Sequence, residues 1–128
     1  MIEIRRNPHP TKAELDALWQ LVWAEPAPIR PERAFSLSLA HVGAYADGQL
    51  VGFVNVIWDG GQHASIFDLG VHPLYRERGI GSELLSEAIG LARQRGARWV
   101  HIDFAPHLKP FFRRRGFGSA EAGVLRLY

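Results

Sequence analysis

The chain has 128 residues, of which 47% are hydrophobic and 22% are charged, and its formal net charge is +2. This length predicts one domain over residues 1–128, and so small an excess of positive charge argues against nucleic acid as a partner. The absence of cysteine excludes disulfides, thiolate metal sites and a cysteine nucleophile, which suits a reducing cytoplasm, and no run approaches the roughly 18 apolar residues of a membrane span.

The N-terminal third is predicted to contain a strand, a helix and an irregular segment. Residues 2–5 alternate between apolar and charged side chains, as strands do. Thr11-Lys12-Ala13-Glu14 is a capping box, after which apolar residues recur at helical spacing. Three prolines between residues 26 and 31 end this helix, and we expect irregular backbone from there to about residue 40.

The middle of the chain is predicted to form three antiparallel strands. Residues 41–45 and 50–58 are strand-like, and the turn between them has Asp-Gly at its centre, which favours a hairpin. A second turn at residues 59–62 leads into a third strand at residues 65–71. The three strands therefore form a meander.

The C-terminal part is predicted to alternate helices and strands. Residues 82–95 have a helical apolar face, and a strand at residues 99–104 follows, parallel to its predecessor through this crossover helix. A short helix is expected at residues 106–115, with its proline in the first turn, and a last strand at residues 124–128. The expected order is β, α, β, β, β, α, β, α, β, in a mixed, mostly antiparallel α/β sheet.

The loop between the third strand and the crossover helix is predicted to bind phosphate. Gly79 and Gly81 lack the Cβ that would keep an anion away from the main chain, and the helix dipole adds roughly half a positive charge there. The loop is not a Walker A motif, because Ser82-Glu83 stands where Lys-Ser/Thr would follow. It is not the dinucleotide fingerprint either, because Leu84 replaces the third glycine.

The pattern Arg76-x-x-Gly79-x-Gly81, led in by Val71-x-Pro73, resembles the pyrophosphate-binding signature of the GNAT superfamily of N-acetyltransferases, which bind acetyl-coenzyme A (acetyl-CoA). Phe111-Phe112-Arg113-Arg114-Arg115-Gly116-Phe117 is similar to a second block of that family. The order of elements also resembles the family over the whole chain, with its second early helix shortened or lost. The resemblance implies a GNAT fold in which the strands at 65–71 and 99–104 splay apart.

The resemblance also implies which residues bind the coenzyme. Backbone N–H groups of residues 78–82 would receive the pyrophosphate, with Arg76 or Arg78 adding charge-assisted hydrogen bonds. One arginine of residues 113–115 would reach the 3′-phosphate, and main-chain groups of the third strand would pair with the pantetheine arm. The implied coenzyme residues are Leu69, Val71, Arg76, Arg78, Gly79, Ile80, Gly81, Ser82 and Phe112.

The candidate acid–base residues depart from the family pattern. Transfer to an amine needs a proton acceptor, because an alkylammonium has a pKa of about 10.4. Ser65 and Phe67, at the positions where relatives carry the base, cannot supply it. Asp68 would reach the site only through a bulge in its strand, and its alternative is a local hydrogen bond. His107 is the second candidate, since it follows the next strand in a loop near the expected thioester.

Phe112 stands where many relatives have the tyrosine that protonates the departing thiolate, so Tyr75, Tyr128 or water would have to replace it. No metal site is predicted, because the His residues at 72, 101 and 107 lie on separate elements, and His101 is expected to be a satisfied or solvated side chain.

These features predict an enzyme, an acyltransferase that moves an acetyl group from acetyl-CoA to a primary amine by direct attack through a tetrahedral intermediate. The acceptor is a small molecule or a peptide. The alternative is a non-catalytic acyl-CoA binding module, and a nucleic-acid binder, suggested only by the C-terminal arginines, ranks last. We expect a cytoplasmic protein with no nucleic-acid or membrane partner, and leave a homodimer open.

Overall fold

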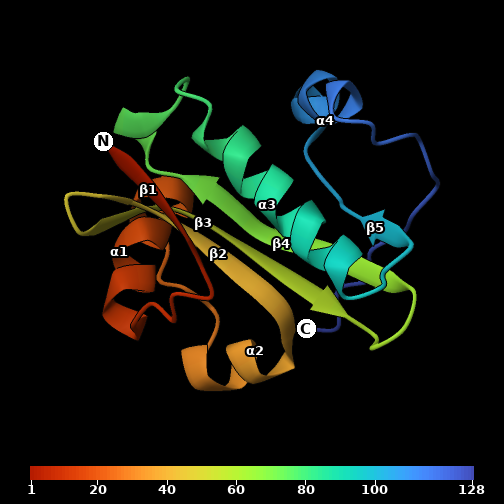
Figure 1. Ribbon diagram of the computed structural model, residues 1–128, viewed down its shortest axis with the longest axis horizontal. Helices are drawn as coiled ribbons and strands as arrows, with labels where there is room; N and C mark the ends of the chain where they lie inside the picture. Colours follow the sequence, from red (N-terminus) through yellow and green to blue (C-terminus); the bar gives the residue numbers. More distant parts are fainter.

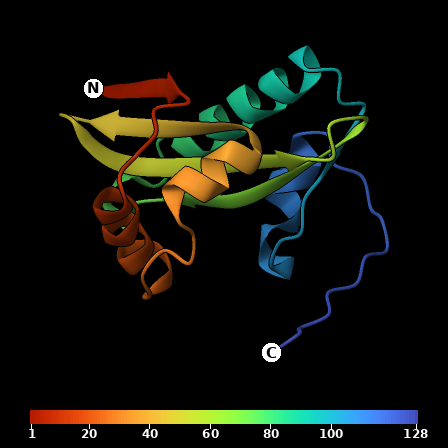
Figure 2. The ribbon, with the colours of Figure 1, turned by 90° about the horizontal axis from the view of Figure 1, so that it is seen from below.

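A computed structural model describes residues 1–128, and it places three layers on one another, with a five-stranded sheet in the middle (Figures 1 and 2). The sheet order is β1-β2-β3-β4-β5, antiparallel except for the last pair. The strands are β1 (Ile2–Arg6), β2 (Ser38–Ala46), β3 (Gln49–Trp58), β4 (His63–Val71) and β5 (Trp99–His101). The predicted hairpin and meander are therefore confirmed.

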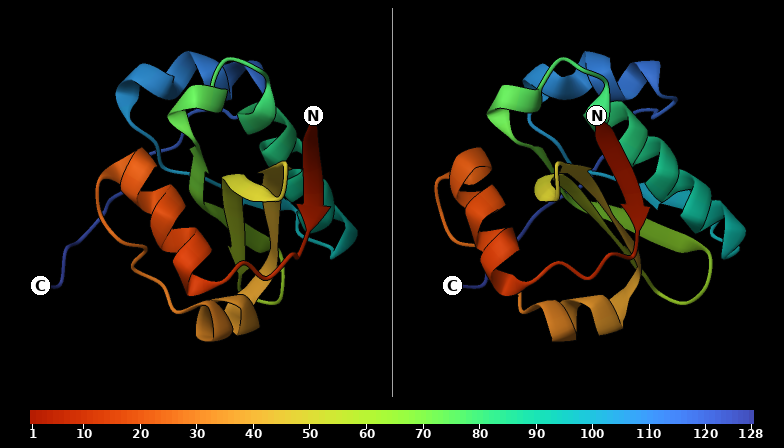
Figure 3. Two further views of the ribbon diagram at one scale, coloured as in Figure 1. Left: turned by 90° about the vertical axis from the view of Figure 1, so that its left-hand side faces the viewer. Right: turned by 60° about the vertical axis from the view of Figure 1, so that its left-hand side comes forward.

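The helices cover both faces of the sheet. Helix α3 lies on one face, and α1 and α2 lie on the other, as the edge-on views of Figure 3 show. The helices are α1 (Lys12–Trp23), α2 (Pro31–Leu37), α3 (Ile80–Gln94) and α4 (Lys109–Arg114), with short 3-10 helices at Pro73–Tyr75 and Pro106–Leu108. None of them combines the length and the apolar character that a membrane-spanning segment needs.

Helix α2 corrects the prediction that the backbone is irregular to about residue 40, and its 7 residues agree with the expectation of a shortened second early helix. Pro31 occupies its first turn, where a missing N–H removes no intrahelical hydrogen bond. The proline therefore starts this helix. The capping box of α1 is confirmed, because the side chains of Thr11 and Glu14 each accept from the other residue's backbone N–H.

Two apolar cores hold the layers together. Leu84, Leu85 and Ala88 of α3 are buried against the central strands, and Leu15 and Leu18 of α1 are buried on the opposite face. Helix α3 approaches β3 so closely that a Cβ added at Gly52 would lie 2.9 Å from Leu84 Cδ1. This contact fixes the start of α3 against the sheet, which is where the predicted phosphate loop ends.

Strand β4 contains the bulge on which the predicted role of Asp68 depends. Phe53 pairs with Gly70 but Asn55 pairs with Phe67, so β4 holds one residue more than β3 over the same length. Asp68 takes the left-handed backbone conformation, with φ +60°. The bulge turns this residue out of the regular alternation of the strand.

Strand β5 separates from β4 after a short parallel pairing. Only residues 99–101 pair, with residues 63–65 of β4, and residues 102–105 have no regular structure. The predicted splay is confirmed, but the predicted strand is too long by three residues. Beyond Ser65, the main-chain edge of β4 that faces β5 has no neighbouring strand.

The predicted last strand at residues 124–128 is wrong. Residues 118–128 are exposed and have no regular structure, and the chain runs away from the sheet to its C-terminus (Figure 2). The pattern Val-Leu-Arg-Leu-Tyr has strand propensity, but a strand becomes stable only through neighbours in a sheet. No such neighbour lies beside this segment.

His41 of β2 is a buried titratable group, with only 2% of its surface exposed. Its ring stacks on that of Phe35, with centroids 3.8 Å apart, and its Nε2 accepts a hydrogen bond of 2.9 Å from the backbone N–H of His9. Burial, assisted by the nearby His9, lowers the pKa of His41 to about 4 from its ordinary 6.5. The folded protein therefore holds this imidazole neutral.

The protein should lose stability in mild acid because of His41. Between pH 4 and pH 6.5 the unfolded chain binds a proton at His41 that the folded chain does not, so the free energy of unfolding rises with pH across this window. The full effect is at most about 3.4 kcal/mol. His41→Gln keeps an acceptor but cannot titrate, so urea denaturation should show a pH slope smaller by up to about one proton. An unchanged slope would contradict the assignment.

Candidate active site

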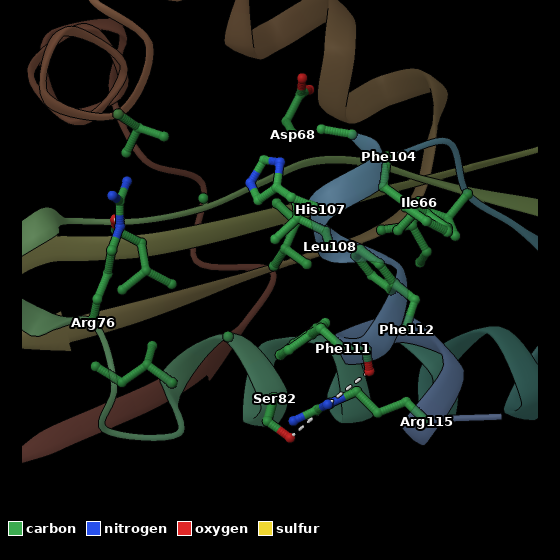
Figure 4. Close-up of a pocket in the computed structure, with 18 of the residues that line it drawn as sticks. Ile66, Asp68, Arg76, Ser82, Phe104, His107, Leu108, Phe111, Phe112 and Arg115 are labelled. Carbon is green, nitrogen blue, oxygen red and sulfur yellow. Dashed lines mark hydrogen bonds between the residues drawn. The ribbon is translucent and has the colours of Figure 1, made fainter. Parts of the chain in front are cut away.

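A cleft of about 1040 Å³ opens where β4 and the chain after β5 separate. Its walls come from β4, the loop and first turn of α3, the segment from residue 102 through α4, and the end of α1 (Figure 4). Most of the residues predicted from the sequence line it: Asp68, Leu69, Val71, Arg76, Gly79, Ile80, Gly81, Ser82, His107 and Phe112.

One end of the cleft is the start of α3, which offers unpaired main-chain donors. Gly79 caps the helix with φ +80°, and no side chain caps it. The first hydrogen bond of the helix runs from the N–H of Glu83 to the carbonyl of Gly79, at 3.0 Å. The N–H groups of Ile80, Gly81 and Ser82 are therefore without protein acceptors, an arrangement that together with the helix dipole can hold an anion.

Two arginines stand beside these donors. Arg76 Nε donates to the carbonyl of Val71 at 3.0 Å, which leaves the outer nitrogens of its guanidinium for other acceptors. Arg115 Nε donates to Ser82 Oγ at 3.1 Å, and another of its nitrogens donates to the carbonyl of Phe111 at 2.8 Å. Arg115 thereby joins the end of α4 to the first turn of α3, as Figure 4 shows.

Arg115 is the functional candidate that the sequence reasoning failed to single out. The sequence marked residues 113–115 as a group in which one arginine would face phosphate. The spacing of Phe111 and Arg115 was the available signal, since residues four apart share a helix face. Arg113 is exposed and its side chain turns to Ser119 instead.

Arg78 is the predicted residue that does not line the cleft. Its guanidinium lies over the ring of Tyr75, 5.0 Å from the centroid. Tyr75 itself lines the cleft, whereas Tyr128 is fully exposed at the chain end. Of the two tyrosines considered as proton donors, Tyr75 is the one that the fold brings to the site.

Phe112 forms part of an aromatic wall at the middle of the cleft. It is 4% exposed, and its ring stacks on that of Phe104 with centroids 4.6 Å apart. Phe111 and Phe117 contact it edge-on. On the other side run Leu69 and Val71, on the edge of β4 that lacks a strand partner. The middle of the cleft thus combines an apolar surface with open main-chain groups.

Asp68 lies at the end of the cleft opposite Arg115, and His107 lies between them (Figure 4). The bulge turns its carboxyl into the cleft, and the structure gives that carboxyl neither a hydrogen bond nor an ion pair. Burial raises the pKa of Asp68 above its ordinary 3.8. The alternative of a local hydrogen bond for Asp68 is therefore not observed, and the group is available as a base.

The remaining histidines are accounted for locally. His101 Nε2 lies 2.8 Å from His63 Nδ1 on the neighbouring strand, so the expectation of a satisfied side chain is confirmed. His72 Nδ1 accepts from the N–H of Leu74 and caps the turn that precedes the phosphate loop. No three side chains of His, Asp or Glu converge as a metal site would require.

The model of the acetyltransferase (GNAT) family matches residues 10–117. The chain belongs to this family. It is 36% identical over 118 residues to a mycothiol acetyltransferase of Clavibacter sepedonicus, an alignment that covers 89% of this chain and 34% of that protein. The chain spans about a third of the length of the mycothiol acetyltransferases that it matches.

Solved structures of the family have the same fold. A GNAT-family acetyltransferase of Streptococcus pneumoniae TIGR4 superposes with a TM-score of 0.84 at 27% identity, over 100% of this chain and 98% of that one. An aminoglycoside N-acetyltransferase crystallised in complex with CoA has a TM-score of 0.79 at 19% identity, over 100% and 95% of the two chains. The GNAT fold predicted from the sequence is confirmed.

Removing the charge of Asp68 should stabilise the protein at neutral pH. Since the folded-state pKa is raised, stability is greatest below the ordinary pKa and falls as the pH rises through the folded value. Asparagine tolerates the positive φ of this position. Asp68→Asn should therefore raise the denaturation midpoint at pH 7, and raise it less at pH 3.5.

Asp47→Asn is the matched control, because Asp47 also has a positive φ, of 49°, but is exposed in the β2–β3 turn. It should leave the midpoint almost unchanged. An Asp68→Asn variant that is less stable than the parent at pH 7 would show that the carboxylate has a stabilising partner.

Proposed function

We propose that the protein transfers an acetyl group from acetyl-CoA to a primary amine, by direct attack of the amine on the thioester. The observation that carries the proposal is a single cleft with an anion site at one end and an unpaired carboxyl at the other. Acetyl-CoA has matching parts, a pyrophosphate, an amide-containing arm and a thioester. A structural neighbour with the same fold was crystallised with CoA, which supports this choice of donor.

The residues fit such a donor along the length of the cleft. The N–H groups of Ile80, Gly81 and Ser82 would bind the pyrophosphate, with charge from Arg76 and Arg115. The open main chain of β4 at Leu69 and Val71 would pair with the pantetheine amides as another strand would. The carbonyl of Val71 already accepts a hydrogen bond from Arg76. An arm amide would therefore pair with the N–H of Val71, or with its carbonyl after Arg76 has moved away.

Proton transfer is proposed to involve Asp68. The attacking amine must be neutral, and Asp68 would take the ammonium proton directly or through a water, with His107 as the second candidate. A carboxyl with a raised pKa is a stronger base than an ordinary aspartate. The amine nitrogen bonds to the carbonyl carbon, a main-chain N–H of β4 stabilises the oxyanion, and the C–S bond of the tetrahedral intermediate then breaks.

The thiolate leaves without a tyrosine at position 112. Its pKa of about 8.5 means that protonation by water costs little free energy at neutral pH, and Tyr75 is the protein donor that lines the cleft.

The second candidate function, a non-catalytic acyl-CoA binding module, is favoured by Phe112 and by the lack of a base at Ser65 and Phe67. Release of free thiol in the presence of a panel of primary amines separates the two functions. A cytoplasmic location and a homodimer stay predictions.

The anion site can be tested by a substitution that the free protein tolerates. A Cβ at Gly81 meets only Val71 Cγ2, at 3.7 Å, so Gly81→Val should fold but place methyl groups beside the unpaired N–H groups. We expect acetyl-CoA to bind at least about tenfold more weakly, a loss of about 1.4 kcal/mol, by calorimetry.

Gly90→Val is the matched control. Gly90 lies in the same helix with no atom within 4 Å of its added Cβ, so the two variants carry the same Gly-to-Val change within one helix. The control should bind acetyl-CoA as the parent does. Equal affinity in both variants would contradict the assignment of the anion site.

The route of the leaving thiol can be tested at two positions. If Tyr75 donates the proton, Tyr75→Phe should lower the turnover number without weakening acetyl-CoA binding, and Phe112→Tyr should leave turnover level or raise it. If water is the donor, Tyr75→Phe should be neutral. Steady-state thiol release measures both. A folded Phe112→Tyr variant without activity would show that Phe112, which packs against Phe104, supports the site in another way.

A further inference from the structure

The end of the cleft around Asp68 has a chemical character of its own, and from it we infer the class of acceptor, an inference that rests on the proposed function. We propose that the acceptor is an arylalkyl primary amine that carries no carboxylate or phosphate close to the amine. We define the acceptor pocket by six cleft residues that lie outside the phosphate loop, α3 and α4: Val22, Trp23, Asp68, Asp103, Phe104 and His107.

Two aromatic side chains from different elements line the acceptor pocket. Trp23, at the end of α1, packs on the main chain of β4 so tightly that a Cβ at Gly70 would lie 2.7 Å from its Cη2. The ring of Trp19 packs against that of Trp23, with their centroids 4.8 Å apart. Trp23 nevertheless remains 40% exposed, so part of its ring is open to the cleft.

Phe104 supplies the second aromatic surface. It lies on the chain after β5, stacks on Phe112 and is 36% exposed. Two preformed ring surfaces, each fixed by a neighbouring ring, favour a flat apolar group over a flexible polar chain. This argument selects an aromatic or similarly flat body for the acceptor.

The charges of the acceptor pocket select against anions. Asp68 and Asp103 both line it and neither takes part in a salt bridge. Arg115 lies beside α3, away from Asp68, and Arg76 donates to the carbonyl of Val71 and not to Asp68 (Figure 4). His107 is the only side chain of the acceptor pocket that can become cationic.

An ammonium group therefore enters a pocket with two uncompensated carboxylates, and a substrate anion would meet them without a fixed cation to neutralise it. The half-buried position of Asp68 strengthens this discrimination, because charges interact more strongly away from bulk water. Amino acids and amino-sugar phosphates carry an anion near the amine and are disfavoured.

Phenethylamine and phenylalanine form a matched pair of probes, since they share the ring and the primary amine and differ in one carboxylate. Calorimetry on the protein saturated with CoA should show phenethylamine binding at least about tenfold more tightly than phenylalanine, and at least about tenfold more tightly than butylamine, which lacks the ring. With acetyl-CoA, mass spectrometry should detect N-acetylphenethylamine.

Substitutions in the pocket should change these ratios separately. Asp103→Asn should reduce the ratio of the affinities for phenethylamine and phenylalanine. Trp23→Leu should reduce the ratio of the affinities for phenethylamine and butylamine. Glu25→Gln is the control, because Glu25 follows α1 and is exposed but does not line the cleft. It should leave both ratios unchanged, and circular dichroism verifies the fold of each variant.

The outcomes separate the acceptor class from the proposed function. Phenethylamine that binds selectively but is not acetylated supports the acceptor pocket and overturns the proposed catalysis. Phenylalanine or butylamine that binds as tightly as phenethylamine overturns the acceptor class, whether or not acetylation occurs. Absence of binding by phenethylamine at millimolar concentration to the CoA complex overturns it as well.

Discussion

The gap between β4 and the chain that follows β5 is the constraint on which the site depends. Parallel pairing stops after residues 99–101, so the edge of β4 beyond Ser65 keeps its main-chain groups unpaired. Strands that continued side by side would close the cleft and leave the start of α3 facing a filled sheet edge. The gap places the N–H groups of α3, the open edge of β4 and the carboxyl of Asp68 in one space. We attribute both the donor and the acceptor chemistry to this single departure from regular pairing.

Features that reduce the stability of the fold lie at this gap. Asp68 has a left-handed backbone conformation and a half-buried carboxyl without a partner, each of which reduces stability. His41, by contrast, is more deeply buried on the other side of the sheet, yet it is stacked on Phe35 and accepts a hydrogen bond. Its cost is offset by these contacts at neutral pH. Strain and charge that are unrelieved at Asp68, but not at His41, are what the proposed role of Asp68 as a base predicts.

The sequence predicted those parts of the molecule that local chemistry decides. Three such features depend only on residues close together in the chain, so the local pattern was sufficient to predict them. They are the capping box at Thr11, the apolar stripe of α3 and the glycines at 79 and 81. From the sequence, we could say only that Asp68 would reach the site if its strand contained a bulge. Whether the bulge exists depends on how β4 pairs with β3, which the sequence of β4 alone does not determine. Pro31 was interpreted as part of an irregular segment, but a proline can also start a helix, and Pro31 occupies the first turn of α2.

The remaining errors concern contacts between distant segments. The strand propensity of residues 124–128 says nothing of whether this segment pairs with a sheet edge, and it does not. Arg115 could not be distinguished from Arg113 without knowing which face of α4 meets Ser82. Trp23 and Phe104 of the acceptor pocket lie about 80 residues apart in the sequence, so no local motif could have predicted this pocket.

Amide hydrogen exchange in the presence and absence of acetyl-CoA tests the central claim most directly. The N–H groups of Ile80, Gly81 and Ser82 have no protein acceptor and should exchange rapidly in the free protein. Saturation with acetyl-CoA should slow them by at least about tenfold, together with amides on the open edge of β4 between residues 68 and 71. Protection confined to the α1–α2 face, or unchanged exchange at these amides under saturating coenzyme, would contradict the account.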